Sequence, residues 1–283
     1  MAKDLTKGNP ASVLFRFALP VIGGNLFQLV YTLADSVIVG RMLGAQALAA
    51  VGSTSIIIYL VPCFIQGITG GFGICLGQRF GARDEAAMRR SVMISWLLSA
   101  FFTVLLTAVC CALAHPILRW MQTPDDIYQD AYAYMWVILA GTGATVFYNA
   151  ISNMLRALGD SRTPLIFLVV SSLGNIALDI LFIGPMEMGV AGAAWATVLS
   201  QLIAAILSAA VGVKNYAVLR PSRLARRDVL PETAAHLRLG FPMGFQMSVM
   251  CIGQLAMQAA VNALGAAAIA GYTAATKVDQ FSV

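Results

Sequence analysis

Residues 12–41 read SVLFRFALPVIGGNLFQLVYTLADSVIVGR, an apolar stretch with one acidic residue, Asp35, well inside it. No charged residue lies between Arg16 and Asp35, and none lies between Asp35 and Arg41. About 20 apolar residues in a helix cross a hydrocarbon core about 30 Å thick, so this stretch predicts a membrane span. An aspartate at the centre of a span costs about 3 kcal/mol on insertion scales. We therefore expect Asp35 to face protein or water and to have a function there.

The polar residues of this stretch share one helix face. Steps of three, four and three residues separate Asn25, Gln28, Thr32 and Asp35. This spacing places side chains above one another along an α-helix. The sequence therefore predicts a polar stripe that faces away from lipid.

The composition predicts an all-α integral membrane protein. Only 11% of the 283 residues are charged and 59% are hydrophobic, whereas soluble domains carry about 25% charged residues. The charges cluster between long apolar runs, which favours helical spans over the alternating strands of a barrel. The pI of 9.1 comes from basic loops, and topology explains it better than nucleic-acid binding does. The five cysteines lie in apolar runs without a CxxC pair, which favours small buried side chains over metal or redox sites.

Seven apolar runs predict spans, and an eighth begins near Ala267. The seven are residues 12–39, 46–77, 91–114, 131–155, 164–184, 190–213 and 241–263. Lysine and arginine concentrate before the first span and in alternate loops, whereas the opposite loops carry Asp125, Asp126 and Glu187. Basic loops favour the cytoplasmic side. We therefore expect a multi-pass protein of the plasma (cell inner) membrane with a cytoplasmic N-terminus.

An internal repeat divides the chain. RFALP at residues 16–20 returns as RLGFP at 238–242, and LGAQALAAVGST at 43–54 is echoed by LGAAAIAGYTAA at 264–275. Six spans separate the copies, which predicts a parallel repeat of two six-helix lobes, although chance similarity of apolar helices is the alternative. We expect a first lobe at 1–213, a cytoplasmic link at 214–240, and the first one to two helices of a second lobe at 241–283.

Further polar residues lie inside the later spans. The run PLIFLVVSSLGNIALDILFIGP at 164–185 contains a second intramembrane acid, Asp179, four residues after Asn175. The same spacing of four recurs in Thr145, Asn149 and Asn153, and again in Thr197 and Gln201. A lone neutral residue can simply bond a neighbouring helix, worth about 0.6 kcal/mol on average. The two aspartates have no intramembrane Lys or Arg nearby in this lobe, so an ion pair does not explain them.

Two ion chemistries fit these residues. Burial penalises an ionised carboxylate, and a second carboxylate nearby penalises it further, so the two acids could exchange a proton as a coupled pair. Alternatively, a ring of oxygens could hold Na⁺, from Asp35, Asn149, Asn175, Asp179 and Thr197. Either ion would change how the first span packs and could trigger a conformational switch.

Four motifs resemble the multidrug and toxic-compound extrusion (MATE) family. They are FALPVIGGNLFQLVYTLADSVIVGRMLGAQALAAVG at 17–52, GQRFGARD at 77–84, NAISNMLRALGDSRTP at 149–164 and GNIALDILFI at 174–183. The resemblance implies a secondary antiporter that exports organic, often cationic compounds against inward H⁺ or Na⁺. It implies no enzymatic activity and no cofactor besides the coupling ion.

The resemblance also implies roles for individual residues. Asp35, Asn175 and Asp179 match the cation site of the family's N-terminal lobe and are the expected Na⁺ ligands if Na⁺ is the ion. Asn149 and Thr197 match supporting positions, with Asn153 as the alternative to Asn149. Candidates for the substrate cavity or for support are Asn25, Gln28, Tyr31, Thr32, Asn153 and Gln201. Family members have twelve spans, so a complete cavity is expected to need the C-terminal spans of a second lobe.

Three alternatives remain open at this point. A lipid-linked precursor flippase of the same superfamily would favour cationic residues in the cavity, whereas the intramembrane charges here are acidic. An intramembrane aspartyl protease would carry YD and GxGD motifs, whereas the contexts here are LAD at 33–35 and ALD at 177–179. A truncated product with a structural or assembly role is the third.

Overall fold

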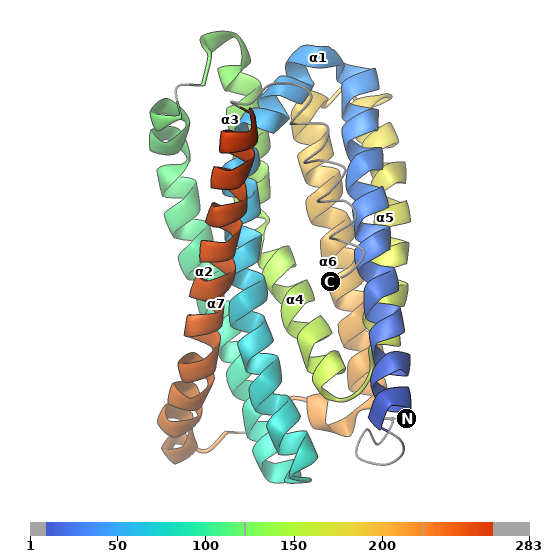
Figure 1. Ribbon diagram of the computed structural model, residues 1–283, viewed down its shortest axis with the longest axis vertical. Helices are drawn as coiled ribbons and strands as arrows, with labels where there is room; N and C mark the ends of the chain where they lie inside the picture. Colours follow the sequence, from blue (N-terminus) through green and yellow to red (C-terminus); the bar gives the residue numbers. More distant parts are fainter. Residues whose placement is uncertain (1–9, 122, 223, 263–283) are drawn as a thin grey trace.

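The protein is a bundle of α-helices, seen in a computed structural model that describes residues 10–121, 123–222 and 224–262 (Figure 1). No strand occurs in those residues. The helices are α1 (Pro10–Gly81), α2 (Glu85–Trp120), α3 (Asp125–Ala140), α4 (Thr142–Ala157), α5 (Arg162–Ile183), α6 (Gly189–Asn215) and α7 (Arg226–Asn262), with a short 3₁₀ turn η1 (Ala217–Leu219) before α7. The predicted all-α class is confirmed.

The first two predicted spans are the two halves of α1. They meet at Gly44, whose φ of 87° and ψ of −178° lie outside the helical region. A positive φ is open to glycine at little cost, which is why the chain can turn there. Figure 1 shows α1 folding over at one end of the bundle, so that its two halves run in opposite directions.

The fourth predicted span is divided between α3 and α4. The two helices are bent by 41° at a short break, where Gly141 stands between them. A Cβ at Gly141 would overlap the side chain of Val198 on α6. The missing side chain therefore lets the bend pack directly against α6.

Several helices have the length and composition of membrane spans. In the described chain four qualify, and the bent pair Asp125–Ala140 with Thr142–Ala157 makes a fifth. The four are Ile57–Gly81, Glu85–Trp120, Arg162–Ile183 and Gly189–Asn215. On α2, Leu97, Phe101 and Val104 expose 53%, 58% and 70% of their surface, a composition that suits contact with lipid. The chain is a multi-pass membrane protein.

The turns between helices gather at two ends of the bundle (Figure 1). One end holds the start of α1, the α1–α2 and α4–α5 turns, and η1. We call it the basic end, because Arg83, Arg162 and Arg220 lie in or beside these turns. The α2–α3 turn, which precedes Asp125 and Asp126, lies at the opposite end. Basic and acidic turns are therefore separated, as the sequence pattern requires.

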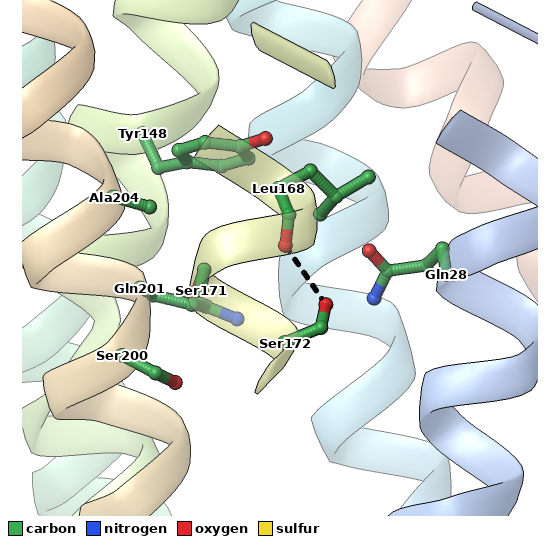
Figure 2. A pocket seen from close by; sticks show the side chains of 8 residues that line it. All are labelled: Gln28, Tyr148, Leu168, Ser171, Ser172, Ser200, Gln201 and Ala204. Atoms are coloured by element: carbon green, nitrogen blue, oxygen red, sulfur yellow. Dashed lines mark hydrogen bonds between the residues drawn. The ribbon is translucent and has the colours of Figure 1, made fainter. Parts of the chain in front are cut away.

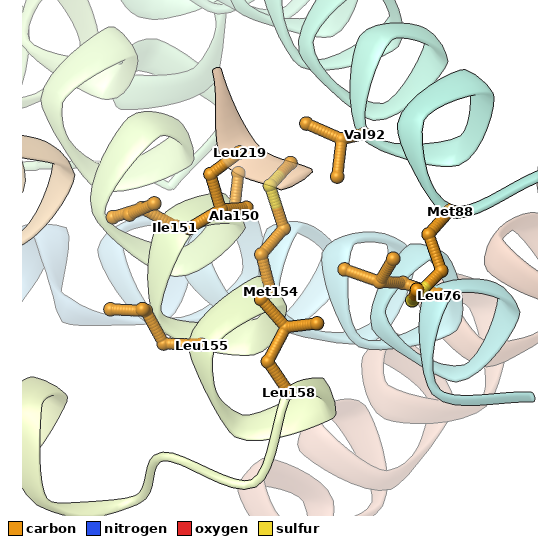
Figure 3. Packing of buried hydrophobic residues seen from close by; sticks show 9 residues of the cluster. All are labelled: Leu76, Met88, Val92, Ala150, Ile151, Met154, Leu155, Leu158 and Leu219. Carbon is orange, nitrogen blue, oxygen red and sulfur yellow. The ribbon is translucent and has the colours of Figure 1, made fainter. Parts of the chain in front are cut away.

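A cluster of buried apolar residues closes the bundle near the basic end (Figure 3). It joins α1, α2, α4 and η1 through Leu76, Met88, Val92, Ala150, Ile151, Met154, Leu155, Leu158 and Leu219. Eight of these nine side chains are at most 2% exposed, and Met88 is 8% exposed. The cluster fixes α4 and the segment before α7 relative to each other.

The start of α5 is held by one carboxylate. Asp160 Oδ1 accepts from the backbone N–H groups of Arg162 (3.1 Å) and Thr163 (3.0 Å), and Oδ2 accepts from Thr163 Oγ1 (2.6 Å) and Tyr216 Oη (3.0 Å). Asp160 thus caps orphan N–H groups at a helix start.

The predicted link at residues 214–240 is mostly ordered secondary structure. It contains the end of α6, η1 and the first part of α7. Helix α7 then runs without a break into the predicted seventh span.

Candidate ion-coupling site

Asp35 and Asp179 meet in the interior of the bundle. Asp35 comes from the first half of α1 and Asp179 from α5, and their carboxyl groups lie within hydrogen-bonding reach of each other. Asp179 is fully buried and Asp35 is half-buried. On each residue Oδ1 is buried and has no hydrogen-bond donor among the described residues. Two ionised carboxylates offer only acceptors, so a hydrogen bond between them forms only when one of them carries a proton.

Asn175 connects Asp179 to α6. Asn175 is fully buried one turn before Asp179 on the same helix. In the amide orientation that gives both ends a partner, Nδ2 donates to Asp179 Oδ2 (3.0 Å), and Oδ1 accepts from the backbone N–H of Thr197 (3.1 Å). Thr197 Oγ1 donates to the carbonyl of Ala193 (3.1 Å). The amide therefore holds the Asp179 carboxylate in one position relative to α6.

The asparagines of α4 do not join this group. Asn149 Nδ2 donates to the carbonyl of Thr145 on its own helix (2.8 Å), and Asn153 Nδ2 donates to Thr69 Oγ1 on α1 (3.1 Å). Thr145 Oγ1 donates to Gln201 Oε1 on α6 (2.7 Å). These candidates for the ion site, together with the cavity or support candidate Gln201, thus divide into two groups. Asp35, Asn175, Asp179 and Thr197 lie together, whereas Asn149, Asn153 and Gln201 tie α4 to itself and to its neighbours.

A small polar pocket lies nearer the basic end, and two of its lining residues, Gln28 and Ser172, come about two helical turns before Asp35 and Asp179 (Figure 2). Its lining comes from α1, α4, α5 and α6: Gln28, Tyr148, Leu168, Ser171, Ser172, Ser200, Gln201 and Ala204. Ser172 lies one turn before Asn175, and Ser200 lies one turn after Thr197. Figure 2 shows Gln28 of α1 facing Ser172, whose hydroxyl donates to the Leu168 carbonyl (2.9 Å). The cavity has a volume of about 40 Å³, which is room for a few water molecules.

The sequence reasoning missed part of this lining. Tyr148 and Ser200 were not among its candidates, although each adjoins a polar residue that was, Asn149 and Gln201. The side chains of Asn25, Tyr31 and Thr32 lie outside the described part of the structure, so their predicted roles stay predictions. The same holds for the stub of an eighth span beyond residue 262.

The chemistry of the group is that of an ion-exchange site. Carboxylate, amide and hydroxyl oxygens are hard ligands, suited to a proton or to a hard cation such as Na⁺. They stand on α1, α5 and α6, so the charge state of the two acids bears on how α1 packs against the other two helices.

Known proteins resemble this chain over nearly its whole length. It is 34% identical over 278 residues to the "Probable multidrug resistance protein YpnP" of Bacillus subtilis (strain 168), which covers 98% of this chain and 62% of that protein. It is 30% identical over 278 residues to the "Probable multidrug resistance protein NorM" of Thermotoga maritima, covering 95% of this chain and 58% of that protein. The chain thus spans about 60% of the length of these curated relatives.

Among solved structures, the fold resembles one titled "Outward-facing conformation of a multidrug resistance MATE family transporter of the MOP superfamily". The TM-score is 0.84 at 27% sequence identity, over 96% of this chain and 60% of that one. Residues 20–181 match the MatE family, and this segment includes both Asp35 and Asp179. Because that match covers more than half of the chain, the protein belongs to the MatE family, the multidrug and toxic-compound extrusion family whose motifs its sequence resembles.

Proposed function

We propose that this chain forms the first lobe of a secondary antiporter that exports organic, cationic, drug-like compounds in exchange for inward H⁺ or Na⁺. The observation that carries the proposal is the close approach of the Asp35 and Asp179 carboxyl groups, on two different helices inside a membrane bundle. Intramembrane acids are costly, and they usually mark ion pathways.

The pair supplies a mechanism for coupling. A shared proton joins α1 to α5, and its loss leaves two like charges in contact. At about 4 Å and an effective dielectric constant of about 20, their repulsion is about 4 kcal/mol. Asp179 is held by Asn175, so Asp35 and α1 are the parts free to respond. Either α1 moves away from α5, or a cation takes the place of the proton.

A change at Asp35 can bias the whole lobe. A ligand shifts a conformational equilibrium only by its difference in affinity for the two states. The first half of α1 packs on α5, where the side chains of Leu165 and Leu168 lie beside Gly24, and the second half packs on α7. Helix α1 therefore joins the ion site to the helix that begins the proposed second lobe.

The charge pattern supports an orientation and a substrate class. We place the basic end in the cytoplasm of a cell whose plasma membrane holds the protein, because basic loops favour that side. We infer a cationic substrate, because Asp35 and Asp179 are acidic residues in the interior of the same bundle as the pocket.

A second lobe completes the cavity in this proposal. The described pocket holds a few water molecules, whereas drug-sized ligands occupy cavities of about 300–1,000 Å³. Residues 1–213 would form the first lobe, 214–240 the link, and 241–283 the start of the second lobe.

Transport in liposomes tests the proposal. The protein is reconstituted together with the C-terminal spans that complete the cavity, and uptake of a cationic dye is measured under an imposed H⁺ or Na⁺ gradient. We expect Asp35→Asn and Asp179→Asn each to abolish gradient-driven uptake while membrane insertion stays normal. Asp126→Asn, an exposed aspartate at the opposite end, is the matched control. Normal uptake by either site variant would remove that residue from the mechanism.

A further inference from the structure

The second half of α1 and α7 make the most extensive helix contact in the described chain. They run antiparallel, and their backbones touch. A Cβ at Gly71 would overlap the backbone of Gly240, and a Cβ at Gly67 would overlap the carbonyl of Met243. Small residues spaced four apart on both helices allow this close approach. Helix α7 is thus docked directly on the first lobe.

At the basic end the same contact becomes polar. Glu232 of α7 forms ion pairs with Arg79 of α1 and with Arg90 of α2, where Arg90 Nε lies 3.2 Å from Oε1. Arg79 Nη1 also donates to the carbonyl of Ala87 (3.1 Å). Glu232 is only 9% exposed, so one carboxylate of α7 is held between two helices of the first lobe.

His236 extends this network one turn further along α7. It is fully buried, with Nδ1 2.7 Å from the Glu232 carbonyl and Nε2 2.7 Å from Ser91 Oγ of α2. A carbonyl only accepts, so Nδ1 carries the proton, and the neutral ring accepts from the Ser91 hydroxyl. Its ring centroid lies 5.8 Å from that of Phe72 on α1. Both ring nitrogens are therefore satisfied, Nδ1 within α7 and Nε2 across the α7–α2 contact.

The two parts of the contact respond differently to separation. Charged side chains that come apart into water regain their hydration, which offsets much of the lost attraction. The glycine section is the contact of Gly67 and Gly71 with α7 around Gly240 and Met243. Its separation exposes apolar surface to water, and no gain in hydration of charged groups offsets that cost. The polar end is therefore the part of the α1–α7 contact that can open and close while the glycine section stays docked.

We propose that this polar network is a latch that closes the cytoplasmic end of the junction between α7 and the first lobe, formed by Arg79, Arg90, Ser91, Glu232 and His236. The latch opens when the cavity opens to the cytoplasm, a step that rests on the proposed transport function. The latch itself rests only on the contacts described above.

Cys75 is a native reporter of the latch. It lies one turn before Arg79 on α1, is 4% exposed, and its Sγ is 3.6 Å from the carbonyl of Ala235 on α7. The thiol of Cys75 is therefore covered by α7, at a position on α1 between Gly71 and Arg79. Opening of the polar end exposes this thiol, and closure protects it.

The test is the rate at which Cys75 reacts with a water-soluble maleimide. The other cysteines are replaced by alanine, at positions Cys63, Cys110, Cys111 and Cys251. We expect Glu232→Gln to raise the rate about tenfold, because the neutral amide no longer forms ion pairs with Arg79 and Arg90. Asp228→Asn, the same change one turn earlier on α7 at a partly exposed aspartate, should leave the rate unchanged.

A second, milder variant controls for the case in which Glu232→Gln exposes Cys75 only because the protein misfolds. Ser91→Ala removes the hydroxyl that His236 accepts from and keeps both ion pairs, so it should raise the rate by a smaller factor. Unchanged rates in Glu232→Gln and Ser91→Ala, or an equal rise in Asp228→Asn, would overturn the latch. The measurement involves no transport, so a protein that fails to transport dye can still show the latch.

Discussion

The carboxyl groups of Asp179 of α5 and Asp35 of α1 lie within hydrogen-bonding reach of each other inside the bundle, and the Asn175 amide bonds only Asp179. The pair is therefore asymmetric. Asp179 is tied through the amide to α6, whereas Asp35 belongs to the helix that also reaches α7. A proton that joins the two carboxyl groups joins a fixed part of the lobe to a part that can move.

The Asn175 amide should matter for stability as well as for transport. Asn175→Ala leaves Asp179 Oδ2 without this donor in a fully buried position. We expect the free energy of unfolding to fall by about 1–3 kcal/mol. Thermal unfolding in detergent measures it, with Asn215→Ala, an exposed asparagine at the end of α6, as the control. Equal stabilities of the two variants would contradict the bridging role.

The glycine contact between α1 and α7 should tolerate no added methyl group. Gly71→Ala places a Cβ against the backbone of Gly240, and overpacking of this kind costs about 1–3 kcal/mol. Gly253→Ala is the matched control on α7, because nothing lies within 4 Å of its added Cβ. Melting temperatures of the two variants check the prediction. A stable Gly71→Ala protein would mean that the helices are not in backbone contact.

Acidic pH should loosen the latch through His236. Burial holds the pKa of His236 below its usual 6.5. The hydrogen bond to the Glu232 carbonyl and the charge of the Glu232 carboxylate raise this pKa, and the charge of Arg79 lowers it. The unfolded chain then binds the proton more readily than the folded chain does. The stability that the neutral ring contributes is complete above about pH 6.5 and is lost as the pH falls below it.

The comparison of wild type with His236→Gln isolates this effect. The groups that face the ring region are Arg79 of α1, Arg90 and Ser91 of α2, and Glu232 of α7, and all remain in the variant. The melting temperatures are compared at about pH 7.5 and about pH 5.5, one unit either side of the usual histidine pKa of about 6.5. We expect the melting temperature of the wild type to drop more between these two pH values than that of His236→Gln. If the melting temperatures of the two proteins fell equally with pH, His236 would not be the source of the pH dependence.

The basic end should face the cytoplasm. Single cysteines at Arg83 and Arg226 should be protected from a membrane-impermeant reagent added outside intact cells, and one at Asp126 should react. The separation of basic and acidic turns at opposite ends of the bundle is the reason. Labelling at position 226 without labelling at 126 would reverse the orientation.

Much of the site followed from helix periodicity. A polar stripe of period 3.6 around Asp35 and the four-residue spacing of Asn175 and Asp179 predicted two helices that hide acids from lipid, and the two acids do meet. Spacing could not say where Asn149 and Asn153 bond, because one partner is on the same helix and the other on α1. Spacing reports the face of a helix but not the neighbour that the face meets.

The latch could not be found from the sequence. His236 and Ser91 are 145 positions apart, and residues 214–240 read as a basic, proline-containing link. Only the folded chain shows that α7 begins inside this link and carries Glu232 and His236 onto α1 and α2. Gly67 and Gly71 are visible in the sequence, but the helix that they contact is not.

Proton release on substrate binding tests the central claim most directly. Purified protein with its C-terminal spans, in weakly buffered solution with a pH indicator, is mixed with a cationic dye, and released protons are counted per bound dye. We expect about one proton from the wild type, because a cation and the shared proton of one carboxyl pair compete for one site. Asp179→Asn should bind dye and release none. A wild type that binds dye without releasing a proton, in the presence and absence of Na⁺ alike, would contradict the account, as would equal release by both proteins.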